Sequence, residues 1–318
     1  MATTFDITNA VDGTAADAFL PEVWAMEIAA AYKSSLVMAD LVGKLNHKGK
    51  RGDVINIQRP DRDAANSKTE NNFVTLIAHT DNNVAVTIDQ HWEYSRIIED
   101  VVGVQAMPSL RKFFTDDAGY ALAKRVDTTI HALASTWGAG TQYSQGVIGS
   151  DGSTNFVQTG SGNGAALTDA GIRRVIQTFD DNDVPTRDRY LVIPPVAKNT
   201  LLGLSRFTEQ AFTGESGAGN SIRNGRVGDI YGVEVFVSSN CETVDSSDCT
   251  SYRAALMFQR DALVLAEQIA PRVQQQYKLE ALGTLLTADV LFGAETVRGE
   301  LAAQADDGAG CKAIIIPE

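Results

Sequence analysis

The sequence is poor in the residues that usually mark a chemical site. Its 318 residues include three cysteines and four histidines, and the histidines lie far apart along the chain. A structural zinc site needs thiolate or imidazole groups at close spacing, so the sequence predicts none. Neither a Walker-type phosphate loop nor a Gly-x-Ser-x-Gly motif is present. We therefore expect no catalytic, cofactor-binding or metal-binding residues, no cofactor, and no enzymatic activity.

Positive charge and long apolar runs are also scarce. The chain has 27 Lys and Arg against 40 Asp and Glu, a net charge of −13, so overall attraction to nucleic acid or to anionic membranes is lacking. No apolar run approaches the roughly 20 residues of a membrane-spanning helix. The first basic residue is Lys33, so we expect no secretory signal. The composition, 44% hydrophobic and 21% charged, is that of a globular protein that binds neither membranes nor specific nucleic-acid sequences.

Three local patterns each allow two interpretations. Cys241 and Cys249 bracket a short acidic loop and are either bridged in an oxidising medium or free reduced thiols. The acidic run 180–183 has ligand types that suit a hard metal, but it lacks the glycine and glutamate of a calcium loop and fits a solvated helix end. His131 falls inside a helical pattern and is more readily a packed or capping residue than a catalytic base.

The N-terminal third predicts an arm, a helix and a long two-stranded excursion. Residues 1–20 have no core pattern, and residues 21–43 have apolar residues at helical spacing, with Gly43 as the stop. Two runs then alternate apolar and polar residues, at 54–60 and, after a turn at 81–83, at 84–90. An isolated hairpin of this polarity is only marginally stable, so we expect it to lie on another surface.

The rest of the chain predicts a mixed α+β fold. Apolar residues at helical spacing over 109–136 predict the longest helix, which would span on the order of 40 Å. A glycine-rich loop covers 138–164, and a mobile insert is expected over 213–228. The remaining predicted elements are a helix from 169 to about 179 capped by Thr168, strands at 190–193, 233–237, 254–258 and 263–268, a helix at 196–207, and within 272–304 a long strand followed by a polar tail.

Three motifs in this order resemble the major capsid proteins of tailed bacteriophages. They are a Gly-x-x-Tyr-Gly-Val-x-Val stretch from Gly228 to Val235, an Ala-Leu-x-Phe-x-x-Asp-Ala run over 255–262, and an Asp-x-Leu-Phe-Gly-Ala stretch over 289–294. None is a catalytic signature, and the resemblance covers nearly the whole chain through the order of its elements. It implies the Hong Kong 97-like capsid fold, an α+β fold with an N-terminal arm, an extended hairpin loop, a long spine helix, and peripheral and axial domains.

The resemblance also implies a division of the chain and a set of partners. The implied parts are an N-terminal arm and helix at 1–45, an extended hairpin loop at 46–95, a peripheral domain with the spine helix at 96–139, an axial domain at 140–270, and a peripheral strand with a C-terminal tail at 271–318. Copies would form hexamers and pentamers of an icosahedral shell around double-stranded DNA, in a virion assembled in the host cytoplasm. Because the front of the chain is short for a cleaved scaffolding segment, we expect either a separate scaffolding protein or assembly without one, with a portal and a decoration protein as further partners. The alternatives are an encapsulin-type compartment and a metal-dependent enzyme.

Contacts between subunits are assigned to basic and aromatic residues in and around the extended loop. The basic cluster that includes Lys44 has no interleaved aromatics, which favours an acidic protein surface over nucleic acid as its partner. Trp92 and Tyr94 are either interface anchors or ordinary half-buried aromatics at a junction between a strand and a helix. The full set of candidates is Lys48, Lys50, Arg51, Arg59, Trp92 and Tyr94.

Some members of the resembled family staple their shells by isopeptide bonds between a loop lysine and an asparagine near the C-terminus. Lys48, Lys50 and Lys68 would supply the amine here. The last asparagine is Asn240, so the segment that should supply the amide has none. The resemblance and this departure from it together predict a shell held by non-covalent contacts.

Overall fold

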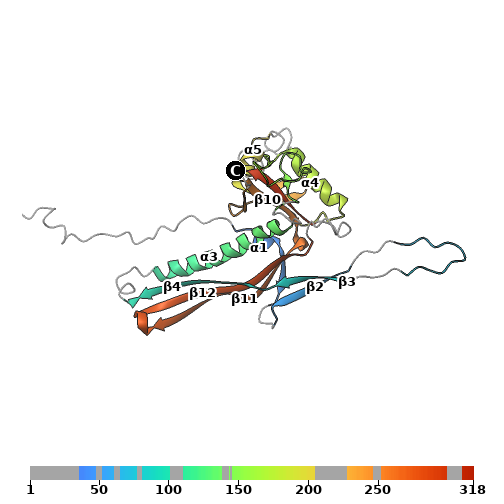
Figure 1. Cartoon of the computed structure of the whole chain (residues 1–318). Helices are drawn as coiled ribbons and strands as arrows, with labels where there is room; N and C mark the ends of the chain where they lie inside the picture. The colour runs from blue at the N-terminus through green and yellow to red at the C-terminus, as the bar shows by residue number, and fades with distance from the viewer. Residues whose placement is uncertain are drawn as a thin grey trace, which may run out of the picture.

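The computed structural model describes residues 36–47, 52–60, 65–76, 81–100, 110–137, 143, 145–204, 228–245, 252–298 and 310–318. Figure 1 shows a long sheet with a helix along one face, a shorter sheet with helices beside it, and a hairpin that projects away from both. The predicted arm (1–20), most of the predicted helix at 21–43 and the predicted mobile insert up to residue 227 lie outside the described residues.

A seven-stranded sheet forms the shorter body. Its strand order is β5-β13-β10-β6-β8-β7, with β9 also paired to β10. The strands are β5 (Val147–Ile148), β6 (Arg189–Ile193), β7 (Asp229–Ile230), β8 (Val233–Val237), β9 (Thr243–Val244), β10 (Tyr252–Gln259) and β13 (Cys311–Pro317). The pairs β6–β8 and β5–β13 are parallel, and β10 is antiparallel to β6, β9 and β13.

The central strands of this sheet are apolar on both faces because both faces are covered. In β10, Ala255 and Met257 pack with α4 (Asp169–Asp181) and α5 (Pro195–Leu202). Leu256 and Phe258 point to the opposite face and join the larger core beneath the spine helix. A strand that is buried on both faces has a continuous apolar sequence, and for this reason the sequence predicts β10.

The helices of this body begin where the sequence predicts. The Thr168 hydroxyl accepts a hydrogen bond from the backbone N–H of Gly171 at 3.1 Å and caps α4, which confirms the predicted N-cap. Helix α5 begins at Pro195 and ends at Leu202. The predicted helix at 196–207 was therefore too long, because residues 203 and 204 are not helical and the residues after them lie outside the described ranges.

A four-stranded sheet and the longest helix form the elongated body. The strand order is β1-β11-β12-β4, where β1 is Gly43–Asn46, β4 is Gln90–Glu99, β11 is Leu263–Lys278 and β12 is Gly283–Thr296. Helix α3 (Leu110–Ala132) runs along one face and continues as a 3₁₀ turn, η2 (Leu133–Thr136), so the predicted helix at 109–136 is confirmed. The short helix α1 (Met38–Leu41) contacts α3, and β1 runs parallel to β11.

Strand β11 corrects two expectations. It was predicted to end near 268 and to belong with the strands of the other body, yet it runs to Lys278 and pairs with β1 and β12. Its register shifts between Glu267 and Arg272, around Pro271, which has no N–H to donate to a ladder. The bulged strand resumes on the far side of the proline. The sequence after Pro271 is polar because this half of the strand is exposed, so it carries no apolar alternation.

The C-terminal tail expected in the segment 271–318 was wrong for its last part. Residues 311–317 form β13, which lies between β5 and β10 in the seven-stranded sheet. Ile314 and Ile316 pack on the side of α4 and α5, and Ile315 packs on the opposite side. The three consecutive isoleucines are therefore the mark of a central strand with two covered faces.

The projecting hairpin pairs β2 (Val54–Pro60) with β3 (Asp81–Thr87) in antiparallel register. The alternation in both runs predicted this pairing. The turn expected at 81–83 was wrong, because these residues begin β3 and pair with Gln58, Arg59 and Pro60. The reversal of the chain lies farther out, where Asn71 takes a left-handed conformation with φ of 62°.

Candidate assembly surfaces

Among the described residues, the contacts of the hairpin with the rest of the subunit lie at its base. Val86 and Ile88 of the returning segment pack on Ala266 of β11, and all three side chains are buried. The Ile88 N–H donates to the Asp53 carbonyl at 2.7 Å, and the Gln268 side-chain amide donates to the Gly52 carbonyl at 3.0 Å. These contacts fix the direction in which the hairpin leaves the body.

Gly293 allows the hairpin base to cross β12 closely. A Cβ atom at this position would lie 2.2 Å from the Thr87 carbonyl oxygen, a distance that no real Cβ contact shows. Gly293 is the glycine of the Asp-x-Leu-Phe-Gly-Ala stretch recognised in the sequence. The motif glycine thus has a mechanical role, since it lets the backbone of β3 approach that of β12.

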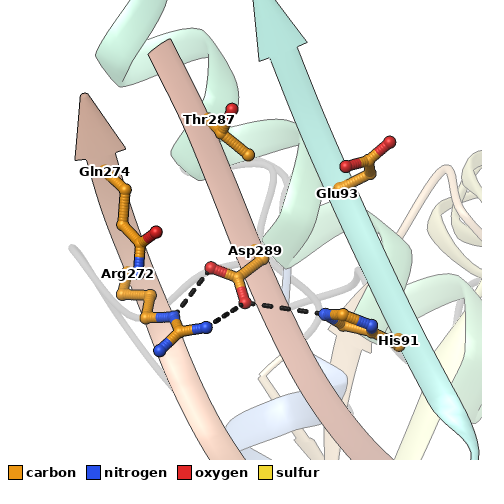
Figure 2. A pocket seen from close by; sticks show the side chains of 6 residues that line it. All are labelled: His91, Glu93, Arg272, Gln274, Thr287 and Asp289. Atoms are coloured by element: carbon orange, nitrogen blue, oxygen red, sulfur yellow. Dashed lines mark hydrogen bonds and ion pairs between the residues drawn. The ribbon is translucent and has the colours of Figure 1, made fainter. Parts of the chain in front are cut away.

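The face of the four-stranded sheet opposite α3 carries a polar cluster across three strands. Arg272 of β11 donates two hydrogen bonds to Asp289 of β12, from Nε at 2.8 Å and from Nη2 at 2.9 Å. His91 of β4 lies on the other side, with Nε2 3.5 Å from Asp289 Oδ2. Figure 2 shows the three side chains in a row over the sheet, with α3 behind it. The hydrogen bonds from Arg272 are the main reason that the pKa of Asp289 lies below its ordinary value.

The opposite face of β4 packs on α3 through aromatic side chains. The Arg125 guanidinium lies 3.8 Å from the centroid of the Trp92 ring, a cation–π contact. The Tyr94 hydroxyl donates to Asp117 at 3.1 Å. These contacts within the chain account for both rings as half-buried aromatics, the second of the two interpretations that the sequence left open. Their contact with another subunit stays a prediction.

A buried carboxylate joins three segments of the chain at the C-terminal half of α3. Asp127 Oδ1 accepts hydrogen bonds from the backbone N–H groups of Val37 and Met38, at 3.1 and 2.9 Å. Its Oδ2 accepts from the Asn240 side-chain amide at 2.9 Å. Through these bonds, Asp127 joins the segment before α1 and the loop after β8 to the spine helix. Its side chain is fully buried, so the bonds to its carboxylate are shielded from water.

His131 lies one turn farther along α3, with Nε2 3.7 Å from Asp127 Oδ2. The ring is buried, and neither ring nitrogen has a hydrogen-bond partner among the residues that the structure describes. Burial lowers the pKa of His131 to about 4, against a smaller opposing effect from the Asp127 charge. The imidazole is therefore neutral at physiological pH, which agrees with a packed histidine rather than a base.

The structure places the other predicted residues as follows. Lys48, Lys50 and Arg51 lie outside the described residues, and only the backbone of Arg59, in β2, is described. Lys44 forms an exposed ion pair with Asp40 at 3.0 Å. Cys241 is buried as a free thiol with a pKa raised to about 12 by burial, and its proposed partner Cys249 lies outside the described residues.

The acidic run 180–183 lies at the C-terminal end of α4, as the solvated-end interpretation predicts. Asp180 pairs with Arg189 at 2.8 Å. Among the described residues, no group of three or more His, Cys, Asp or Glu side chains is arranged to hold a metal ion. Within the described ranges, no helix is long and apolar enough to span a membrane.

Sequence reasoning missed Asp127 and the Arg272–Asp289 pair. An aspartate inside a helical pattern looks like a solvated residue, and its backbone partners lie about 90 positions away. Arg272 and Asp289 face each other only because β11 resumes in a shifted register after Pro271. The one signal in the sequence is the Asp-x-Leu-Phe-Gly-Ala stretch, which begins with Asp289.

The fold matches those of virus shells over nearly its full length. A solved chain from Mycobacterium phage Che8 superposes with a TM-score of 0.71 at 20% identity, covering 93% of this chain and 97% of that one. The capsid of cyanophage P-SCSP1u gives a TM-score of 0.67 at 17% identity, with 95% and 94% covered. The mature capsid of bacteriophage PhiM1 gives 0.67 at 13% identity, with 93% and 92% covered. The search of curated proteins finds no significant match.

This fold, with an elongated sheet under a spine helix, a second compact sheet and a projecting hairpin, is thus shared with solved chains of phage capsids. A family model described as phage capsid protein matches residues 99–300, which is well over half of the chain. The chain belongs to this phage capsid protein family, and its place is in the shell of the virion.

Proposed function

We propose that this chain is the major capsid protein of a tailed bacteriophage and has the Hong Kong 97-like arrangement. Its copies assemble as hexamers and pentamers into an icosahedral shell that encloses double-stranded DNA. The observation that carries this proposal is the β2–β3 hairpin, which leaves the body of the subunit and buries little beyond its base. A two-stranded ribbon without a covering layer needs a surface outside its own subunit.

The parts of the fold correspond to the parts of such a subunit. The four-stranded sheet with α3 is the peripheral domain, and the seven-stranded sheet with α4 and α5 is the axial domain, at the centre of each capsomer. The hairpin is the extended loop. We assign β13 to the axial domain, because it pairs with β10, and β11 to the peripheral domain, because it pairs with β12.

The charge of the chain supports a container for DNA. A net charge of −13 gives the subunit little electrostatic attraction to phosphate. A shell that attracted DNA phosphates strongly would oppose packaging and release of the genome. A separate scaffolding protein, a portal and a decoration protein are the partners that this function calls for, with assembly in the host cytoplasm.

Size-exclusion chromatography of the full chain, followed by negative-stain electron microscopy, tests the proposal. Closed shells or capsomer rings are expected, and a compact 34.1 kDa monomer at all concentrations would overturn it. Particles purified from infected cells should contain DNA and a portal. Particles filled with a cargo protein and no DNA would identify an encapsulin-type compartment instead.

Hydrogen exchange tests the hairpin directly. Amides of 54–59 and 81–87 should exchange slowly in particles and quickly in free subunits, because only the particle supplies a covering surface. The buried strand β10 serves as the control and should be protected in both states. Equal, strong protection of the hairpin in free subunits would show that it packs within its own subunit.

A further inference from the structure

The outer half of β11 has an open edge in the part of the chain that the structure describes. Strand β1 runs beside β11 only from Val264 to Glu267, and no described strand continues along that edge beside residues 272–278. The other edge of these residues is paired with β12 throughout. At about 3.3 Å per residue, the open stretch is roughly 23 Å long. An edge of this length is a template for pairing with an extended chain.

Two half-exposed apolar side chains lie on one face at this edge. Val273 is 45% exposed and Tyr277 46%. Val273 lies opposite Ala288, whose side chain is buried beneath α3, so Val273 and Tyr277 are on the face of the sheet that carries the helix. The Tyr277 hydroxyl donates to Asp100 at 2.7 Å, which holds the ring over the sheet. A strand added at this edge would therefore meet an apolar surface on that face.

A segment near the start of the sequence has the pattern of such a strand. Residues 3–8 read Thr-Thr-Phe-Asp-Ile-Thr, so in an extended chain Phe5 and Ile7 fall on one face and Asp6 on the other. Thr, Phe and Ile are all favoured in strands. The pattern is too short to form a core of its own, but it is long enough to extend an existing sheet. These residues lie outside the described part of the chain.

The charges favour β11 over β4, the strand at the other edge of the sheet. Residues 272–278 contain Arg272, which is paired with Asp289, and Lys278, and they contain no acidic residue. Strand β4 has two glutamates and one arginine. Residues 1–32 contain five Asp and Glu and no Lys or Arg. An acidic segment is therefore attracted to the edge of β11 and repelled by the edge of β4.

The chain before the described residues is long enough to reach this edge. Val37 is held by Asp127 on the C-terminal half of α3. Residues 9–35 span about 60 Å even if 21–35 are helical, against about 50 Å for the whole of β11. Because β11 runs away from this junction (Figure 1), an antiparallel strand at its edge leads the chain back toward Val37. The covalent link also gives the segment a high effective concentration at this edge, which favours its own subunit over a neighbour.

We infer that residues 3–8 pair with the outer half of β11 in the same chain, as an antiparallel edge strand. The two apolar residues of the segment then cover those of β11, and Asp6 shares the other face with Lys278. The segment occupies the backbone groups of the edge, so free subunits cannot pair with one another through β11. The contact lies within one subunit and does not depend on the proposed function.

Engineered cysteines test the pairing in free subunits of the full chain. The background is Cys249→Ser, and the other two native cysteines are buried. Thr4→Cys is combined either with Gln274→Cys or with Gln276→Cys, because all three positions share the polar face of the pairing. At least one pair should form a disulfide, which requires Cα atoms within about 7 Å. The matched control combines Thr4→Cys with Ser95→Cys, an exposed position on β4, and should form none.

Isotope labelling shows whether the disulfide joins residues of one chain. Subunits labelled with light and with heavy nitrogen are mixed in equal amounts before oxidation, and the linked peptides are weighed after proteolysis. Pairing within a chain gives peptides that are entirely light or entirely heavy. Mixed peptides as the main product would overturn the inference. An equal yield in the Ser95→Cys control, or no disulfide from either pair, would overturn it as well.

Hydrogen exchange gives a second measurement that needs no engineered thiols. In free subunits carrying Phe5→Asp, the amides of 272–278 should exchange about tenfold faster than in the wild type, because the added strand is lost. Phe19→Asp makes the same substitution outside the pairing segment and should leave these rates unchanged. The amides of β10 should stay protected in both variants and so report that the body is folded. Equal rates for 272–278 in the two variants would overturn the pairing.

Discussion

The side-chain amide of Asn240 donates to the buried carboxylate of Asp127 over 2.9 Å and so joins the loop after β8 to the spine helix. The same carboxylate holds the two backbone N–H groups at the start of α1. One residue therefore fixes how the N-terminal segment, the spine helix and the seven-stranded sheet meet. Because the group is charged and buried, each of its hydrogen bonds is stronger than a bond between neutral groups.

Replacing Asp127 with asparagine should destabilise the subunit by about 2 to 3 kcal/mol, because an amide cannot accept all three bonds and leaves a buried donor unpaired. Chemical unfolding of the free subunit measures the change. Asp181→Asn, an exposed aspartate at the end of α4, is the control and should stay within about 0.5 kcal/mol of the wild type. Equal stability of the two variants would show that Asp127 has no such joining role.

The subunit should lose stability on acidification because of His131. Its pKa in the folded state is about 4, below the ordinary value of 6.5, so the unfolded chain takes up a proton first. The stabilisation is complete above pH 6.5 and decreases as the pH falls toward 4, by up to about 3 kcal/mol. Unfolding free energies measured across this range should show the decline.

The variant His131→Leu should flatten this decline between pH 6.5 and 4, since it removes the group that protonates on unfolding. His91→Gln, which removes an exposed imidazole, serves as the control and should keep most of the slope. A His131→Leu variant as acid-sensitive as the wild type would assign the sensitivity to other groups.

Two glycines in helices should respond to alanine in opposite directions. Gly119 of α3 is exposed, and an added Cβ would have no atom within 4 Å apart from its chain neighbours and the backbone of its own helix, so Gly119→Ala should stabilise by about 0.5 to 1 kcal/mol. At Gly171 of α4, the Cβ would lie 2.0 Å from the Gly149 carbonyl oxygen. Gly171→Ala must push the glycine-rich loop away from α4 and should lower the melting temperature clearly. Thermal unfolding of both variants checks the pair, and a shared sign would contradict the packing described for α4.

Purified particles should hold together without covalent bonds between subunits. The last asparagine in the chain, Asn240, has its amide engaged by Asp127, and residues 241–318 contain no other. Boiled, reduced particles should therefore give one band near 34.1 kDa on a denaturing gel. Bands at pentamer and hexamer size that survive reduction would refute this expectation.

Local patterns predicted those elements whose residues carry their own signal. Thr168 at the start of α4, the alternation in β2 and β3, and the apolar run of β10 each reflect a single element and its burial. The sequence could not predict which strands pair when they lie far apart along the chain. Nothing local says that β1 runs parallel to β11, or that β11 continues beyond Pro271 as a polar strand.

The candidate surfaces were predictable only in part, for the same reason. The need of the hairpin for an external surface followed from its polarity, but its exposed apolar end required knowledge of where the chain turns back, at Asn71 and not at 81–83. The Arg272–Asp289 pair depends on a register that a bulge sets. Asp127 depends on partners brought together by the whole fold.

The position of β13 bears on when a newly made subunit becomes usable. The ribosome delivers residues 311–317 after every other strand that the structure describes, yet this strand sits between β5 and β10 and completes two of the ladders of its sheet. A nascent chain released early has every surface of the hairpin and of the elongated sheet but lacks this strand. Truncated translation products would thus be left with an open, aggregation-prone sheet and be cleared by host proteases before they enter a shell.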